Sequence, residues 1–135
     1  MTTDLERLGQ AIKRTQWRNH RTMDTALHDV GVTLVQWDAL RAIDRMPGAS
    51  GHDLAVATFQ SDQAFGTLAT RMVDRGLIVR SAGQGRRIDH ALTPAGRSAL
   101  DQGHRIAGQV LDDLFAPLGE AERRTLADLL GRLTG

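Results

Sequence analysis

The stretch from Ser50 to Gly96 carries closely spaced start and stop signals for secondary structure, and their order constrains the fold more than any other part of the chain. Ser50 and Ser61 each stand where a helix N-cap is expected, because a serine hydroxyl accepts a hydrogen bond from the free amides of a first helical turn. Two short helices with separate caps and a brief turn between them form the helix-turn-helix pattern. Their predicted inward positions are Leu54 and Ala57, then Phe65, Leu68, Ala69 and Met72.

A β-hairpin is predicted directly after the second of these helices, which Gly76 ends. Leu77-Ile78-Val79 begins one strand, since β-branched residues favour strands, and residues 88–92 form the return strand. Ala82-Gly83-Gln84-Gly85 is predicted to be the turn, in which both glycines allow a positive φ angle. Thr93 as N-cap and Pro94 as first helical residue then start another helix.

Further helices are predicted on both sides of this module. The first thirty residues carry apolar side chains at helical spacing up to Gly31, and Thr33 opens a second helix with Gln36 at capping-box spacing. After the hairpin, a helix is expected from Pro94 to about Phe115, and a last one from about Glu120. The inward stripe of the helix from Pro94 is predicted to be Ala95, Ala99, Ile106, Val110 and Leu114.

The charge of the chain is distributed unevenly. The net charge is only +1, so the total alone does not indicate a nucleic-acid partner. Between residues 61 and 97, however, six arginines face three aspartates, whereas from residue 98 onward six acidic residues outnumber four arginines. The positive charge is therefore concentrated on the helix-turn-helix and hairpin, as a surface that binds phosphate requires.

Several classes of protein are disfavoured by what the sequence lacks. Cysteine is absent, which excludes disulfides and thiolate metal sites in this chain. No run of 18 apolar residues and no signal-peptide pattern is present, so we expect a cytoplasmic protein without a membrane span. No nucleophile elbow, phosphate-binding loop or H-E-x-x-H zinc motif occurs, so we expect no enzyme and no cofactor.

The order of these elements resembles the MarR family of bacterial winged-helix transcription regulators. The residues that carry the resemblance are the recognition helix from Ser61 to Arg75, Arg75-Gly76-Leu77-Ile78, the wing Gln84-Gly85-Arg86-Arg87 and Leu92-Thr93-Pro94-Ala95-Gly96. The flanking helices also match in length and order, so the resemblance covers nearly the whole chain. The wing of the family commonly carries Asp-x-Arg, and Gln84 stands here at the position of the aspartate.

A set of DNA contacts follows from these predictions. With the apolar stripe of the recognition helix inward, Gln63 can pair with adenine edges, Arg71 can reach guanine or phosphate, and Ala64 and Thr67 can contact thymine methyl groups. Ser50 and Ser61 stand at helix N-termini, whose free amides favour phosphate. Arg86 at the wing tip is expected to enter the minor groove, with Arg87 or Arg80 on backbone phosphate.

Each of these residues also has an ordinary structural interpretation. The outward face of the recognition helix can be a solvated surface, and Arg86 and Arg87 can be ordinary hairpin charges. Arg71 can pair with Asp74 or Asp62 instead of with a base. If all of these hold, the chain is a winged-helix adaptor for protein partners that does not bind DNA.

The terminal helices predict a homodimer. Residues 1–31 and 94–135 contribute more helix than a small winged module of residues 33–93 needs for its own core. Packing against a second copy would set two recognition helices about 34–36 Å apart on a pseudo-palindromic operator. The alternative is that these helices complete a monomeric core.

The resemblance also implies a pocket for a small effector between the dimerisation helices and the winged module. Candidate residues are Trp17, His20, Arg21, Trp37 and Arg41, whose aromatic and cationic groups suit an aromatic or phenolic anion. Both tryptophans can instead belong to the core. His20, Asp24 and His28 lie at helical spacing but extend about 12 Å along one helix, so no metal site is predicted.

Taken together, the sequence predicts a mainly α-helical chain with a small β-hairpin wing, arranged as a single domain over residues 1–135. Its predicted function is that of a sequence-specific, double-stranded-DNA-binding regulator, a dimeric repressor that responds to a ligand.

Overall fold

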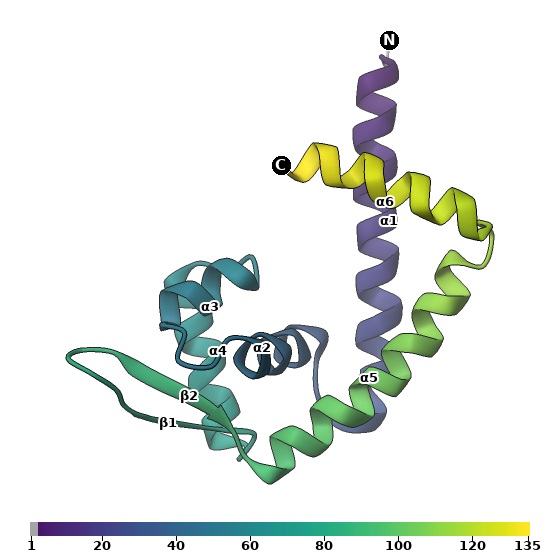
Figure 1. Ribbon diagram of the computed structural model, residues 1–135. Helices are drawn as coiled ribbons and strands as arrows, with labels where there is room; N and C mark the ends of the chain where they lie inside the picture. Colours follow the sequence, from purple (N-terminus) through teal and green to yellow (C-terminus); the bar gives the residue numbers. More distant parts are fainter. Residues whose placement is uncertain (1–2) are drawn as a thin grey trace.

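The computed structural model describes residues 3–135 and has two parts (Figure 1). The α-helices are α1 (Asp4–Leu27), α2 (Leu34–Arg45), α3 (Gly51–Ala57), α4 (Asp62–Asp74), α5 (Pro94–Phe115) and α6 (Glu120–Thr134), with a short 3₁₀ helix η1 (His28–Val30) after α1. Strands β1 (Ile78–Ala82) and β2 (Ile88–Leu92) form one antiparallel hairpin. Helices α2, α3 and α4 lie beside the hairpin, whereas α1, α5 and α6 form a separate helical arm that holds both termini.

Side-chain caps start most of the helices where the sequence places them. The hydroxyls of Thr33, Ser50, Ser61 and Thr93 each accept a hydrogen bond from the backbone amide three residues later, at 3.0–3.1 Å. These bonds satisfy amides that the first turn of a helix otherwise leaves free. The predicted starts of α2, α3, α4 and α5 are therefore confirmed.

The core lies where α1, α2 and α5 meet the helix-turn-helix. Its most deeply buried large side chains come from six different elements or turns, namely Leu27, Leu40, Leu54, Met72, Ile78 and Leu100. One predicted inward position of α3 is wrong. Ala57 is exposed and Ala55 is fully buried instead, because the chain turns back after α3 so that the amides of Thr58 and Gln60 donate to the Ala55 carbonyl.

The inward face of α5 also differs from the prediction. Ala95 is exposed, whereas Gly96 and Gly103 are buried at close approaches to the rest of the fold. A Cβ on Gly96 would lie 2.0 Å from the carbonyl oxygen of Leu77, and one on Gly103 would lie 2.1 Å from Nε1 of Trp37. Glycine at these two positions therefore lets α5 pack tightly on the start of β1 and on α2.

The loop between the two strands of the hairpin is longer than the predicted turn. Ala82 pairs with Ile88, so the loop consists of residues 83–87 and includes Arg86 and Arg87. Of the two turn glycines, only Gly85 has a positive φ angle, at 64°. At Gly83 a Cβ would lie 2.9 Å from a carboxylate oxygen of Asp89, which is the end of a side chain that can rotate away.

Polar contacts join α1, α2 and α4 around the first turn of α2. The carboxylate of Asp24 in α1 accepts a hydrogen bond from the amide of Leu34 at 2.7 Å. Arg75, which follows α4, donates to the buried side chain of Gln36 at 3.2 Å and to the carbonyl oxygen of Gly31. The start of α2 is therefore bonded on one side to the helical arm and on the other to the end of α4.

Both ends of the chain leave apolar side chains exposed. Leu5 and Leu8 on α1 are 80% and 54% exposed, and Leu133 on α6 is 68% exposed. Every residue of α6 is at least partly exposed. Among residues 3–135, no helix is both long and apolar enough to cross a membrane.

Candidate nucleic-acid interface

The outer face of α4 carries the side chains predicted to read DNA bases. Phe65, Ala69 and Met72 are buried, which turns the opposite face of this helix to solvent. Gln63, Ala64, Thr67 and Arg71 are all exposed, and they line one side of a groove whose other side is the first turn of α2. The predicted orientation of α4 is therefore confirmed.

A second groove, of about 350 Å³, runs between the helix-turn-helix and the hairpin. Its lining joins Ser50 from the start of α3 with Arg80 from β1 and with Arg86 and Arg87 from the wing loop. Arg80 donates a hydrogen bond to the Thr70 hydroxyl on α4 at 3.0 Å, so this strand is fixed to the recognition helix. Four residues that were predicted to contact phosphate or the minor groove thus line one groove beside α4.

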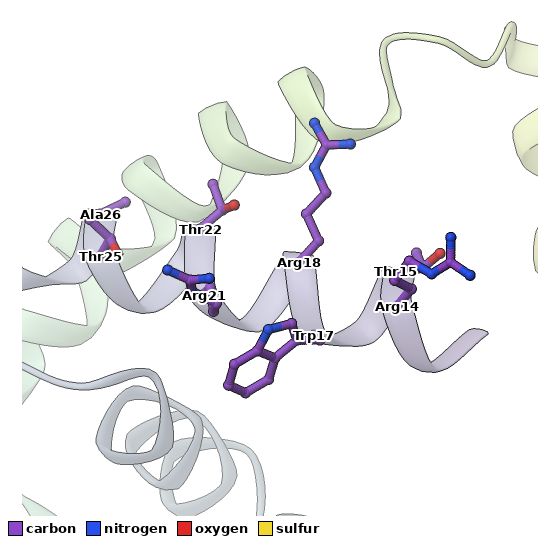
Figure 2. Close-up of a pocket in the computed structure, with 8 residues that line it drawn as sticks. All are labelled: Arg14, Thr15, Trp17, Arg18, Arg21, Thr22, Thr25 and Ala26. Atoms are coloured by element: carbon purple, nitrogen blue, oxygen red, sulfur yellow. The ribbon is translucent and has the colours of Figure 1, made fainter. Parts of the chain in front are cut away.

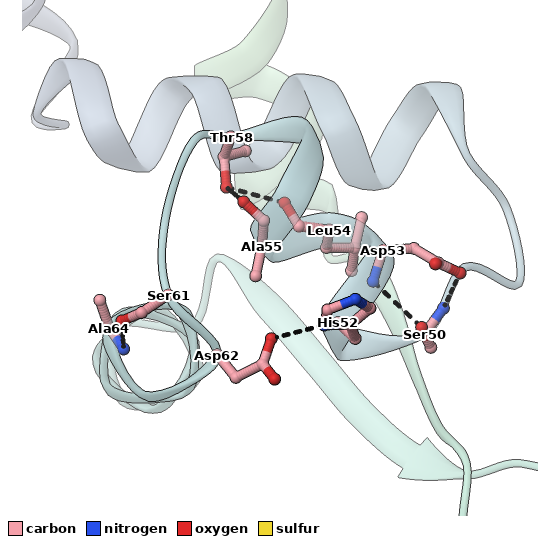
Figure 3. Close-up of polar contacts among 9 residues, drawn as sticks. All are labelled: Ser50, His52, Asp53, Leu54, Ala55, Thr58, Ser61, Asp62 and Ala64. Atoms are coloured by element: carbon pink, nitrogen blue, oxygen red, sulfur yellow. Dashed lines mark hydrogen bonds and ion pairs between the residues drawn. The ribbon is translucent and has the colours of Figure 1, made fainter.

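The hydroxyls of the two cap serines each accept a hydrogen bond from an amide of the helix that they cap (Figure 3). Ser50 accepts from the amide of Asp53 while the Asp53 carboxylate accepts from the amide of Ser50, and Ser61 accepts from the amide of Ala64. These serine hydroxyls serve as helix caps. Bonding with Ser50 holds the pKa of Asp53 below its usual value, so a carboxylate stays beside the start of α3.

Arg71 forms no ion pair within residues 3–135, so neither Asp62 nor Asp74 holds it. Its guanidinium is therefore available on the exposed face of α4. Asp62 accepts instead from His52 of α3 at 2.9 Å. Sequence reasoning missed His52, because ten residues separate the pair and only the fold of the turn brings them together.

The wing loop is closed by backbone hydrogen bonds despite the glutamine at position 84. The amide of Gly83 donates to the carbonyl oxygen of Arg87 at 2.7 Å, and the amide of Arg87 donates to that of Gln84 at 3.2 Å. Asp89 packs its carboxylate beside Gly83 at the base of the loop. The loop therefore has its own internal support, and it presents the exposed Arg86 and Arg87 side chains to solvent.

The predicted effector residues fall into two groups. Trp17 is 59% exposed on α1, its ring lies parallel to that of His20 at 6.3 Å, and the Arg21 guanidinium lies 5.9 Å from its centre. Figure 2 shows this open part of α1, where Arg14 and Arg18 add further positive charge. Trp17 and Arg18 point to different sides of the helix.

Trp37 is a core residue in this structure. It is 4% exposed, donates from Nε1 to the carbonyl oxygen of Leu100 at 3.2 Å, and has the Arg41 guanidinium 4.8 Å from its ring centre. Arg41 also pairs with Asp38, on which burial raises the pKa against the opposing charges of Arg41 and His20. The open group on α1 is therefore distinct from the buried group around Trp37.

Comparisons with known proteins match this geometry. The sequence model of the MarR family matches residues 30–88. The transcriptional repressor Rv2887 of Mycobacterium tuberculosis is 29% identical over 113 residues, which cover 79% of this chain and 81% of that protein. A structure of that repressor with p-aminosalicylic acid superposes with a TM-score of 0.77 at 25% identity, covering 95% of this chain and 98% of that one.

Two further structures share the fold. A "probable transcriptional regulator" from Pseudomonas aeruginosa is 31% identical, covers 93% of this chain and 95% of its own, and has a TM-score of 0.83. A MarR mutant from E. coli in complex with operator DNA has a TM-score of 0.90 at 22% identity, covering 98% and 96% of the two chains. The protein belongs to the MarR family of winged-helix transcriptional regulators.

Proposed function

We propose that this protein is a repressor that binds a pseudo-palindromic DNA operator as a homodimer. The observation that carries the proposal is the exposed row Gln63, Thr67 and Arg71 on α4, flanked by the Arg86 and Arg87 side chains of the wing. Such a row matches the hydrogen-bonding edges of bases in the major groove, and an arginine at a wing tip suits the narrow minor groove beside it.

The apolar side chains left exposed on the terminal helices support the dimer. Leu5, Leu8 and Ile12 continue the buried stripe of α1 into solvent, and Leu129 and Leu133 are exposed on α6. Burying such side chains contributes about 1.5–3 kcal/mol each, so a second copy that covers them gives a stable association. The two recognition helices of the dimer then read half-sites about one helical turn of DNA apart.

A small aromatic acid is the effector class that fits best. The related repressor from M. tuberculosis was solved with p-aminosalicylic acid. The Trp17 ring with the Arg21 guanidinium offers a flat apolar surface and positive charge to such a molecule. Release from DNA requires that the effector bind the DNA-competent spacing of the two recognition helices less tightly than another spacing.

This mechanism needs occupancy of DNA and no chemical turnover, so the proposal is a regulator rather than an enzyme. It also implies a cytoplasmic protein, because a repressor works where its operator lies.

The test is fluorescence anisotropy with labelled DNA from upstream of the protein's own gene, across a series of salt concentrations. Arg86→Ala and Arg71→Ala are expected to weaken binding, with the Arg71 variant losing about 1–3 kcal/mol of discrimination among sequences. Arg105→Ala, an exposed arginine on α5, is the matched control and is expected to bind as the wild type does.

The competing function is a winged-helix adaptor for protein partners. It predicts flat anisotropy at low salt on both this DNA and pooled genomic fragments. That result, with a folded and dimeric protein, would overturn the proposed repressor.

A further inference from the structure

The hydrogen-bonded pair of His52 and Asp62 lies on the surface that the proposed function turns toward DNA. It joins the two helices of the helix-turn-helix, since His52 is the second residue of α3 and Asp62 is the first of α4 (Figure 3). Nδ1 of the imidazole is 2.9 Å from the carboxylate, and the two side chains are 69% and 70% exposed. The pair is therefore held by a hydrogen bond while it remains open to a ligand.

Charged groups from several elements surround this pair. Arg80, Arg86 and Arg87 of the hairpin line the same groove, as does His90 of β2. Asp53 of α3 acts on His52 as a second negative charge. His52 thus stands between the recognition helix and the wing arginines, where a DNA backbone that contacts both would pass.

The hydrogen bond to Asp62 decides what the other ring nitrogen can do. In the neutral imidazole, the proton stays on Nδ1 to bond the carboxylate, and Nε2 carries only a lone pair. A phosphate oxygen is also an acceptor, so the neutral ring has nothing to donate to it. In the imidazolium cation Nε2 carries a proton and becomes a charge-assisted donor directed away from Asp62.

We propose that His52 is an additional phosphate contact of this interface, oriented by Asp62, and that it makes the contact only as the imidazolium cation. The proposal rests on the proposed DNA-binding function. Without the proton on His52, Asp62 also presents an unbalanced negative charge to the DNA. Protonation of His52 thus adds an attraction to the phosphate and offsets the repulsion between the phosphate and Asp62.

In the protein without DNA, the groups around His52 favour its imidazolium cation. The hydrogen bond that His52 donates to Asp62, and then the charge of Asp62, raise the pKa of His52. A bound phosphate raises it further, so DNA binding takes up a proton and the affinity falls as the pH rises through this range. His90 does not contribute in the same way, since burial and the charge of Arg80 lower its pKa.

The experiment measures how strongly salt weakens binding, at pH 6 and at pH 8, with the labelled upstream DNA. One phosphate contact changes the slope of log affinity against log salt by about 0.9. Between 50 and 200 mM salt, the wild type is therefore expected to lose about 3.5-fold more affinity at pH 6 than at pH 8.

Variants of His52 separate this contact from other effects of pH. His52→Gln keeps a polar side chain without the charge and is expected to show the shallower slope at both pH values. His52→Arg is a permanent cation and is expected to show the steeper slope at both. His28→Gln, at an exposed histidine after α1, is the matched control and keeps the difference of the wild type.

Asp62→Asn tests the orienting role. It removes the charge that raises the pKa of His52, so the midpoint of the pH dependence is expected to move to lower pH. An equal slope at pH 6 and pH 8 in the wild type, or a pH difference that survives in His52→Gln, would overturn the proposal while leaving DNA binding intact. Absence of DNA binding at both pH values would overturn the proposed function itself, and this contact with it.

Discussion

Replacing Gly96 by alanine tests whether the close approach of α5 to the hairpin holds the wing in place. The new Cβ would lie 2.0 Å from the carbonyl oxygen of Leu77 and 3.0 Å from its carbonyl carbon. A carbon and a carbonyl oxygen come into contact at about 3.3 Å, so α5 and the start of β1 must separate by about 1 Å. Gly96 lies within α5, and the Leu77 carbonyl is held by a hydrogen bond from the amide of Thr93, so neither position moves without straining other contacts.

The cost follows from the contacts that this separation strains. Overpacking of this kind costs about 1–3 kcal/mol. The amide of Thr93 donates to the same Leu77 oxygen at 3.1 Å, and the Thr93 hydroxyl donates to the carbonyl oxygen of Gly76, so about 1 kcal/mol for each weakened bond is added. The higher helix propensity of alanine offsets up to about 1 kcal/mol of this loss in the free energy of unfolding. The net loss in free energy of unfolding is expected to be about 2–4 kcal/mol.

Urea unfolding followed by far-UV circular dichroism, at one fixed protein concentration, measures this loss. Gly66→Ala is the matched control, because it also adds one methyl group within a helix but meets nothing within 4 Å. It is expected to raise stability by up to about 1 kcal/mol. A Gly96→Ala protein as stable as the wild type would refute the argument that the backbone of Leu77 blocks this position.

Two further predictions concern contacts of α2. Trp37→Phe removes the hydrogen bond to the Leu100 carbonyl and is expected to lower the free energy of unfolding in urea by about 1–3 kcal/mol. The fluorescence emission of the buried tryptophan is lost as well. Unaltered stability would contradict the role of this bond. The hydrogen bond from Arg97 lowers the pKa of Asp44, so this pair stabilises the fold above the unfolded-state pKa of about 3.9 and loses its effect as the pH falls below that value. Asp44→Asn is therefore expected to lower the urea midpoint at pH 7 and to leave it unchanged near pH 2, and an equal shift at both would exclude the pair as the cause.

The helix starts were predictable from the sequence because a cap is a local interaction. Thr33, Ser50, Ser61 and Thr93 each bond an amide three residues away, so the spacing alone contains the information. The burial of α5 was not predictable in the same way. A search for apolar periodicity gives no weight to glycine, yet Gly96 is where α5 meets the hairpin backbone most closely.

Part of the candidate interface was also predictable, because it depends on the pattern within a single helix. The apolar stripe of α4 determines which face of this helix is buried. The exposure of Gln63, Thr67 and Arg71 on the other face therefore follows from the sequence of the helix alone. The bond between His52 and Asp62 depends on how tightly the chain turns between α3 and α4, which no local spacing encodes. For Trp37 the sequence left both a pocket and a core position open, because an aromatic residue among cations fits both. The burial of Trp37 and its packing against Gly103 favour the core.

The hydrogen bonds at the start of α2 couple the tilt of α1 to the orientation of the recognition helix α4. With 24 residues at about 1.5 Å each, this helix is about 36 Å long, and Asp24, which holds the amide of Leu34, lies near one end of it. A displacement of about 3 Å at the far end, where Leu5 is exposed, then corresponds to a tilt of about 6° at this pivot. Arg75 bonds the same turn to the end of α4, so the recognition helix follows the tilt. In the proposed homodimer, a small shift where the two copies meet would therefore change the angle at which each recognition helix is presented.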